Sequence, residues 1–176
     1  ITGTTSIDAK TYDGTRNGTG SIALTGVVAG DNVGANGTYT FVDANAGNGK
    51  SVAVNGVTFN GADAGNYSIV VSGATVADIL QRSITVTADP KSKVEGSVDP
   101  ALTYGVTQGA LVAGDTLTGN MTRAPGEAPG AYAIGQGTLS ASANYRLTFV
   151  GSTLTITEAP ATPVVNPLAA ARSSPS

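Results

Sequence analysis

The sequence contains no cysteine, no histidine and no tryptophan. Without the first two residue types the chain lacks a thiol nucleophile, the commonest general base and the commonest metal ligand. The absence of cysteine also excludes the disulfide framework that small secreted β domains often carry. We therefore expect the chain to have no enzymatic activity and to need no cofactor.

Charge and long apolar segments are scarce as well. Charged residues make up 12% of the sequence, aromatic residues make up 5%, and the net charge is −3. The basic residues are scattered singly, so we expect no surface for nucleic acid or for an anionic membrane. No apolar run reaches transmembrane length, so membrane insertion is not expected. The first residue is Ile1 rather than Met, and we interpret the chain as a piece of a longer protein whose targeting signal lies elsewhere.

What is abundant points to β structure. The chain has 24 glycines, and threonine, valine and serine are common, which is typical of strands joined by turns. The pair Asn55-Gly56 is compatible with a hairpin turn or with a bulge inside one long strand. No window supports a helix longer than a turn or two. Apolar alternation predicts strands over residues 21–24, 37–42, 51–59, 67–71, 75–80, 84–88, 101–106, 117–122, 131–139, 145–150 and 153–157.

Short phrases recur in two copies along the chain. Residues 28–31, Val-Ala-Gly-Asp, return as residues 112–115, and Asn66-Tyr67 returns as Asn144-Tyr145. A period of about 80 residues is too long for a solenoid unit and fits a small β domain repeated in tandem. The copies predict one β domain at residues 1–81 and a second at residues 82–158.

The predicted connection between the two domains is very short. The last strand of the first copy reaches about Leu80 and the next begins at about Ser83, so only Gln81 and Arg82 lie between them. Two residues cannot act as a flexible tether, so we expect the domains to stack with a restricted angle, as a semi-rigid rod. Residues 159–176 are rich in proline, alanine and serine without periodicity, which predicts a disordered, protease-sensitive linker or tail.

The expected fold class is all-β, with two tandem small β-sandwich domains of the immunoglobulin-like type. A β-grasp-like sheet is the alternative, disfavoured by the missing helix pattern. Tyr67 and Tyr145 both follow an asparagine and precede alternating apolar residues, so we assign them equivalent buried structural roles. In immunoglobulin-like folds a tyrosine at this place bonds back to the backbone and fixes a corner.

The candidate metal ligands are Asp31, Asp43 and Asp63. Calcium takes six to eight oxygen ligands, usually with several carboxylates close together, whereas these three acids are spread singly. We therefore favour a structural role for the segment around Asp63 over a calcium site. Four other tyrosines, Tyr12, Tyr39, Tyr104 and Tyr132, are compatible with stacking on sugar rings or with core positions, and we favour the core.

The first copy resembles a known family through two phrases. Residues 10–15, Lys-Thr-Tyr-Asp-Gly-Thr, and residues 61–67, Gly-Ala-Asp-Ala-Gly-Asn-Tyr, are similar to the YDG domain of large bacterial haemagglutinin-like adhesins. The second copy resembles the MBG domain (YGX type) that usually follows it. One departure is that residues 93–96 read Lys-Val-Glu-Gly, where that family usually has a Tyr-Gly phrase after its lysine. The residues that match the second family are 84–88, 99–104, 114–119, 130–134 and 144–145.

The resemblance implies a repeat region of an exported giant adhesin of a Gram-negative bacterium, such as a passenger of two-partner secretion, located at the cell surface or outside the cell. It implies a structural function without catalysis: modules that extend or space a binding head, with neighbouring repeats of the same chain as partners. The runner-up is a module whose loops bind a glycan or a host protein. A binding module is expected to gather exposed aromatic side chains along one edge, whereas a spacer is expected to be polar throughout.

Overall fold

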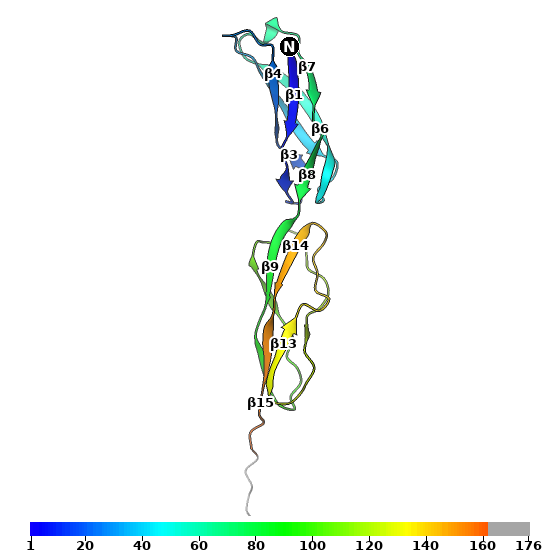
Figure 1. Ribbon diagram of the computed structural model, residues 1–176, viewed down its shortest axis with the longest axis vertical. Coiled ribbons are helices and arrows are strands. Elements are labelled where there is room, and N and C mark those ends of the chain that lie inside the picture. Colours follow the sequence, from blue (N-terminus) through cyan, green and yellow to red (C-terminus); the bar gives the residue numbers. More distant parts are fainter. Residues whose placement is uncertain (162–176) are drawn as a thin grey trace, which may run out of the picture.

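The computed structural model describes residues 1–161, and within them the chain is all-β. The molecule is elongated, with two β bodies stacked end to end along its long axis (Figure 1). We call residues 1–81 the N-terminal half and residues 82–158 the C-terminal half. No helix among the described residues is long and apolar enough to cross a membrane. Of the predicted tail, residues 162–176 lie outside the described part of the chain.

The N-terminal half is built from two sheets. One sheet has the strand order β4-β1-β7 and the other has the order β2-β8-β6-β5-β3. A single 3-10 turn, η1 (Ala64–Asn66), precedes β7. The strands of this half are β1 (Thr2–Ile7), β2 (Lys10–Thr11), β3 (Asn17–Gly18), β4 (Gly20–Thr25), β5 (Gly34–Phe41), β6 (Gly47–Asn60), β7 (Val70–Gly73) and β8 (Val76–Leu80).

The C-terminal half repeats this plan. One of its sheets has the order β11-β9-β14 and the other has the order β10-β15-β13-β12. Its strands are β9 (Arg82–Ala88), β10 (Lys91–Val94), β11 (Tyr104–Gln108), β12 (Thr122–Arg123), β13 (Gly130–Gly135), β14 (Tyr145–Val150) and β15 (Ser152–Thr157).

The two halves share one pairing scheme. The first strand of each half, β1 or β9, pairs antiparallel with β4 or β11 and parallel with the penultimate strand, β7 or β14. The second strand, β2 or β10, pairs parallel with the last strand, β8 or β15. The immunoglobulin arrangement consists of antiparallel sheets. Each half differs from it in having two sheets that combine parallel and antiparallel pairs, and these two sheets enclose the interior of that half.

The core follows the two-residue alternation seen in the sequence. Ile84, Val86 and Ala88 of β9 are buried, and so are Leu154 and Ile156 of β15 in the other sheet. Successive side chains of a strand point to opposite faces, so each of these strands presents its apolar side to the space between the sheets. This arrangement continues into the N-terminal half through Phe41, Val52 and Ile79, which belong to the same buried cluster.

Several predicted strands need correction. Segments β1 and β10 form strands that alternation did not predict, because their inward positions hold Gly3, Thr5 and Lys93 in place of large apolar residues. The prediction of a strand over residues 117–122 is wrong except for one bridge between Thr118 and Ser140 and for Thr122, which begins β12. Gly119 has a φ of 86° there, and a Cβ would lie 2.1 Å from the carbonyl oxygen of Thr138, so the chain turns instead of extending.

The ambiguity at Asn55-Gly56 is resolved as a bulge. Strand β6 runs without a break through both residues, and its register with β5 shifts at this point. Gly56 has a φ of 58°, a conformation that glycine adopts readily and that is common at bulges. The predicted short connection between the halves is confirmed, since β8 ends at Leu80 and β9 begins at Arg82.

Candidate functional site

A tyrosine–aspartate pair holds the same turn in each half. In the C-terminal half the amide of Asp115 donates to the carbonyl oxygen of Val112 at 3.0 Å, which closes the repeated Val-Ala-Gly-Asp phrase into a turn. The hydroxyl of Tyr145 donates to Asp115 Oδ2 at 2.6 Å and accepts the amide of Val112 at 2.8 Å. One phenol thereby fixes both ends of the turn.

The N-terminal half contains the matching set of contacts. The amide of Asp31 donates to the carbonyl oxygen of Val28 at 3.1 Å. The hydroxyl of Tyr67 donates to Asp31 Oδ2 at 2.5 Å and accepts the amide of Val28 at 3.0 Å. The expected bond from tyrosine to backbone is therefore present, but its partner lies in a distant turn and not just upstream. Both repeated phrases serve this contact.

The two tyrosines differ in burial, which departs from the expectation of equivalent buried roles. Tyr145 is 5% exposed, whereas Tyr67 is half-buried. The difference has a visible cause, because the ring of Tyr12 from the N-terminal half packs edge to face on Tyr145 with a centroid distance of 5.5 Å and an interplanar angle of 79°. Among the described residues, no ring packs on Tyr67 in this way.

Tyr12 is the centre of the contact between the two halves, which we call the junction. It directly follows β2, and its amide donates to the carbonyl oxygen of Leu80 at 2.9 Å. Its side chain is 6% exposed, and its hydroxyl donates to Asp115 Oδ2 at 3.0 Å. Burial and the neighbouring Asp115 carboxylate raise the pKa of both Tyr12 and Tyr145, so both phenols keep the proton that they donate.

Further polar contacts complete the junction. The side chain of Asn144 accepts the amide of Ala46 at 2.8 Å and donates to Asn45 Oδ1 at 3.2 Å. Gln81, the single residue between β8 and β9, donates from Nε2 to the carbonyl oxygen of Ala143 at 2.9 Å. The bonds of Asn144 join the two halves away from the covalent connection, and the bond of Gln81 fixes that connection itself.

The three aspartates considered as metal ligands are engaged in other contacts. Asp31 accepts from Tyr67, and Asp63 Oδ2 accepts the amide of Asn32 at 2.8 Å, so these two acids lie near each other. Asp43 is remote from them along β5 and β6 and forms an ion pair with Lys50 at 2.7 Å. Within residues 1–161, no group of three or more potential metal-ligating side chains is brought together.

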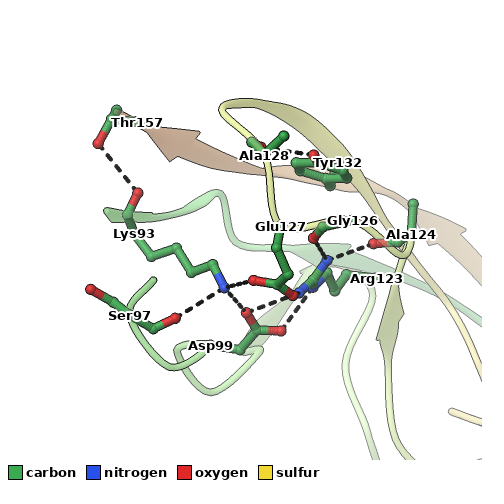
Figure 2. A network of polar contacts seen from close by, with 10 residues as sticks. All are labelled: Lys93, Ser97, Asp99, Arg123, Ala124, Gly126, Glu127, Ala128, Tyr132 and Thr157. Atoms are coloured by element: carbon green, nitrogen blue, oxygen red, sulfur yellow. Dashed lines mark hydrogen bonds and ion pairs between the residues drawn. The ribbon is translucent and has the colours of Figure 1, made fainter. Parts of the chain in front are cut away.

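A second polar network lies in the C-terminal half, around Lys93 (Figure 2). The ammonium of Lys93 donates to Asp99 Oδ1 at 2.7 Å and to Glu127 Oε2 at 2.5 Å, and its side chain is 4% exposed. Arg123 donates from Nε to Asp99 Oδ2 at 2.8 Å and pairs with Glu127 as well. The Arg123 guanidinium and the Lys93 ammonium lower the pKa of Asp99 to about 2. This network ties the loops that follow β10 and β12 to each other.

Lys93 corresponds to Lys10 in the other half. Each lysine lies on the strand that pairs parallel with the last strand, and each binds the loop that follows. Lys10 donates to the carbonyl oxygens of Thr15 at 2.9 Å and Asn17 at 2.8 Å, as Lys93 does to that of Ser97 at 3.1 Å. The departure from the usual phrase at residues 93–96 therefore leaves the loop anchored by its lysine.

The residue that replaces the tyrosine in this departure is Glu95. Its amide donates to the carbonyl oxygen of Thr157 at 2.8 Å, just as the amide of Tyr12 donates to that of Leu80. Glu95 is exposed, whereas Tyr12 is buried in the junction. The C-terminal half thus has a carboxylate at the place where the N-terminal half carries its junction tyrosine.

The Lys93→Met variant tests whether the polar network stabilises the C-terminal half. A methionine keeps most of the apolar stem but leaves Asp99 and Glu127 without the ammonium. We expect the thermal midpoint to fall by several degrees and the pKa of Asp99, followed by carboxyl NMR, to rise toward 3.8. A carboxyl whose pKa falls on folding from 3.8 to about 2 stabilises the fold above pH 3.8, and this contribution is lost as the pH falls through about 2.

The matched control for this prediction is Lys91→Met, two residues earlier on the same strand. The Lys91 ammonium contacts only the hydroxyl of Thr103, at 2.6 Å, among the contacts of the described residues. We expect this control to melt close to the parent chain and to leave the pKa of Asp99 unchanged. Equal effects of the two substitutions would contradict the network.

The sequence did not identify Tyr12, Asp115 and Asn144 as a contact between halves. Tyr12 was considered for sugar stacking or for the core, with the core favoured, since nothing in a local pattern shows which distant segment a side chain meets. The sequence did contain one signal: the Val-Ala-Gly-Asp and Asn-Tyr phrases recur together, and in both halves the two phrases contact each other.

Comparison with known protein families matches each half separately. Residues 1–76 match the family model of the YDG domain, and residues 84–155 match that of the MBG domain (YGX type). The resemblance inferred from the sequence phrases is therefore confirmed in both identity and order. No curated protein and no solved structure matches the chain.

Proposed function

We propose a structural function for this chain, which carries a YDG domain followed by an MBG domain (YGX type): the two domains act as a stiff spacer within an exported bacterial adhesin. Domains of these two families are typical of repeat regions in extracellular adhesins. On this proposal the chain works at the cell surface or outside the cell, and its partners are the neighbouring repeats of the same protein.

The observation that carries the proposal is the junction. One residue, Gln81, separates β8 from β9, and buried side chains of both domains form one cluster across this point. Tyr12 and Asn144 add hydrogen bonds between the two domains. A connection of one residue with packing around it leaves the domains little freedom to swivel, and a spacer needs that stiffness to hold a distant group away from a surface.

The distribution of aromatic side chains favours the spacer over the binding module. Tyr12 and Tyr39 are buried, and the exposed aromatic residues among those described are Phe59 and Tyr104. These two belong to different domains, on β6 and β11, so they do not gather along one edge. A sugar-binding edge built on stacked rings has little support in this arrangement.

We also propose that the chain has no catalytic role and that each domain is a variant of the immunoglobulin-like sandwich, with the β-grasp-like arrangement as the alternative. The first part rests on the lack of histidine and cysteine in the sequence. The second rests on the two sheets that enclose one interior in each domain, with buried residues such as Val86 and Leu154 contributed from opposite sheets.

A binding experiment separates the spacer from the binding module. The full chain is immobilised and exposed to a panel of glycans and host matrix proteins at concentrations up to the millimolar range, where even weak binding is measurable. We expect no saturable binding, because the exposed aromatic side chains of residues 1–161 do not gather into a cluster that could hold a ligand. A saturable signal that is lost in Tyr104→Ala or Phe59→Ala would instead support the binding module.

A further inference from the structure

The internal repeat allows the junction to be compared with the free end of the YDG domain. At the junction, the MBG domain contributes Val112, Asp115, Asn144 and Tyr145. Val112 faces Gly14 closely, since a Cβ on that glycine would lie 2.8 Å from Val112 Cγ1. The side chains of Asp115 and Tyr145 contact Tyr12. The side chain of Asn144 binds Asn45 and Ala46.

The YDG domain carries the same four residue types in the same arrangement at its own far end. They are Val28, Asp31, Asn66 and Tyr67. The turn formed by residues 28–31 and its bonds to Tyr67 match those of residues 112–115 and Tyr145. Val28 is 62% exposed, Asn66 is exposed and Tyr67 is half-buried. This end therefore has the residues that the MBG domain contributes to the junction, but among the described residues no domain packs on them.

We infer that this end of the YDG domain, formed by Val28, Asp31, Asn66 and Tyr67, is a docking surface for the tyrosine-bearing end of a second YDG module, that is, of a second copy of residues 1–81. The occupant follows from the occupied site in the same chain. The phenol of Tyr12 in the second copy donates to the Asp31 carboxylate and packs on Tyr67, and its Ala46 amide donates to the Asn66 side chain. The inference rests on the spacer function proposed above and names the neighbour that the spacer accepts.

The chemistry of this surface selects its partner. Asp31 already accepts the hydroxyl of Tyr67, and a second neutral donor such as a phenol satisfies the remaining carboxylate oxygen lone pairs, as Tyr12 and Tyr145 together do at Asp115. A carboxylate in the place of the phenol would face Asp31 as a like charge. The MBG domain has such a carboxylate, Glu95, at the equivalent position, so its own far end does not fit.

The register of strand pairing shows where a second YDG copy must be joined to the chain. Ile84 pairs with Leu147 in the MBG domain, and Ile1 lies at the equivalent place beside β7, where its carbonyl oxygen accepts the amide of Val70 at 3.2 Å. A second copy of residues 1–83 placed directly before Ile1 of the full chain therefore supplies Arg82 and Ser83 before Ile1, as they precede Ile84. The resulting tandem chain contains one new junction and the native one.

Spin labels measure both junctions in the tandem chain. The native junction is spanned by Ser51→Cys and Thr148→Cys, both exposed strand positions in a chain without other cysteines. The new junction is spanned by Ser51→Cys in the added copy and Val70→Cys in the following domain, where Val70 is 66% exposed. We expect the interspin distance distribution across the new junction to be as narrow as that across the native one.

Substitutions in the added copy identify the contact. Tyr12→Glu introduces the side chain found at Glu95 and is expected to broaden the distribution across the new junction at least twofold, with the native junction unchanged. The matched control is Thr11→Glu in the same copy, which adds the same charge at the neighbouring exposed position and is expected to leave both distributions narrow.

The distance distributions across the two junctions distinguish a failure of the inference from a failure of the proposed function. A broad distribution across the new junction together with a narrow one across the native junction overturns the inference and leaves the spacer function intact. A broad distribution across the native junction counts against the spacer function itself. Equal effects of Tyr12→Glu and Thr11→Glu would also overturn the inference, because the contact would then not depend on the phenol.

Discussion

Replacing Tyr145 with alanine is expected to destabilise the MBG domain by about 3–5 kcal/mol, the range found when large aromatic residues are removed from a core. The ring is 5% exposed, and its hydroxyl bonds to both Asp115 and Val112. For a domain of this size such a loss corresponds to a fall of more than about 10 °C in the thermal midpoint. Calorimetry on the full chain, in which the two domains can melt separately, measures it.

The repeat provides a graded comparison for this prediction. Tyr67→Ala removes the same hydrogen bonds in the YDG domain, but from a half-buried ring, so we expect a smaller fall in the midpoint. Tyr104→Ala, at a residue that is 40% exposed on β11, is the control with little expected effect. If the Tyr145 and Tyr67 variants both melt like the parent chain, the two tyrosine–aspartate pairs do not stabilise their domains and the prediction is wrong.

Replacing Tyr12 with glutamate is expected to loosen the native junction while both domains stay folded. The substitution removes the edge-to-face contact with Tyr145 and brings a carboxylate toward Asp115, to which the phenol had donated. In the full chain labelled at Ser51→Cys and Thr148→Cys, we expect the narrow interspin distribution to broaden at least twofold. Small-angle scattering should then require a spread of interdomain angles.

Asn144→Ala tests a second set of contacts in the same junction. It removes the bonds to Ala46 and Asn45 but leaves the aromatic contact, so we expect a smaller broadening than with Tyr12→Glu. Thr11→Glu again serves as the control for added charge. A parent chain with a broad distribution, or with the domains folded side by side, would contradict the spacer and favour the binding module.

Part of this architecture could be predicted from the sequence. The alternation in residues 84–88 and 153–157 predicted β9 and β15, because their inward positions hold large apolar residues. Strand β1 escaped prediction for the opposite reason. Its inward residues are Gly3 and Thr5. A Cβ added to Gly3 would lie 3.0 Å from Ile22 Cγ2, and the hydroxyl of Thr5 donates to the carbonyl oxygen of Ala74 at 2.9 Å. Neither residue signals burial by its type.

The candidate site was predicted only in outline. The repeated phrases pointed to Tyr67 and Tyr145 as equivalent residues, and the short connection at Gln81 pointed to stacked domains. The side chain that joins the domains, Tyr12, contacts a residue more than a hundred positions away. Contacts of this kind depend on how the two sheets end in space, and the local periodicity of a single sequence does not contain that information.

The exposed carboxylate of Glu95 has a consequence for the behaviour of free chains in solution. A contact between two different ends of one molecule is heterologous, and when it repeats without closing it builds open filaments. Tyr12 is already covered by the MBG domain, and the equivalent end of the MBG domain carries Glu95, which would meet Asp31 of another copy as a like charge. On the docking inference above, separate copies of residues 1–161 are therefore expected not to polymerise end to end, although each carries the receiving half of the inferred contact. The length of the rod would then be set by the number of domains encoded in one chain, and association between separate chains would not extend it.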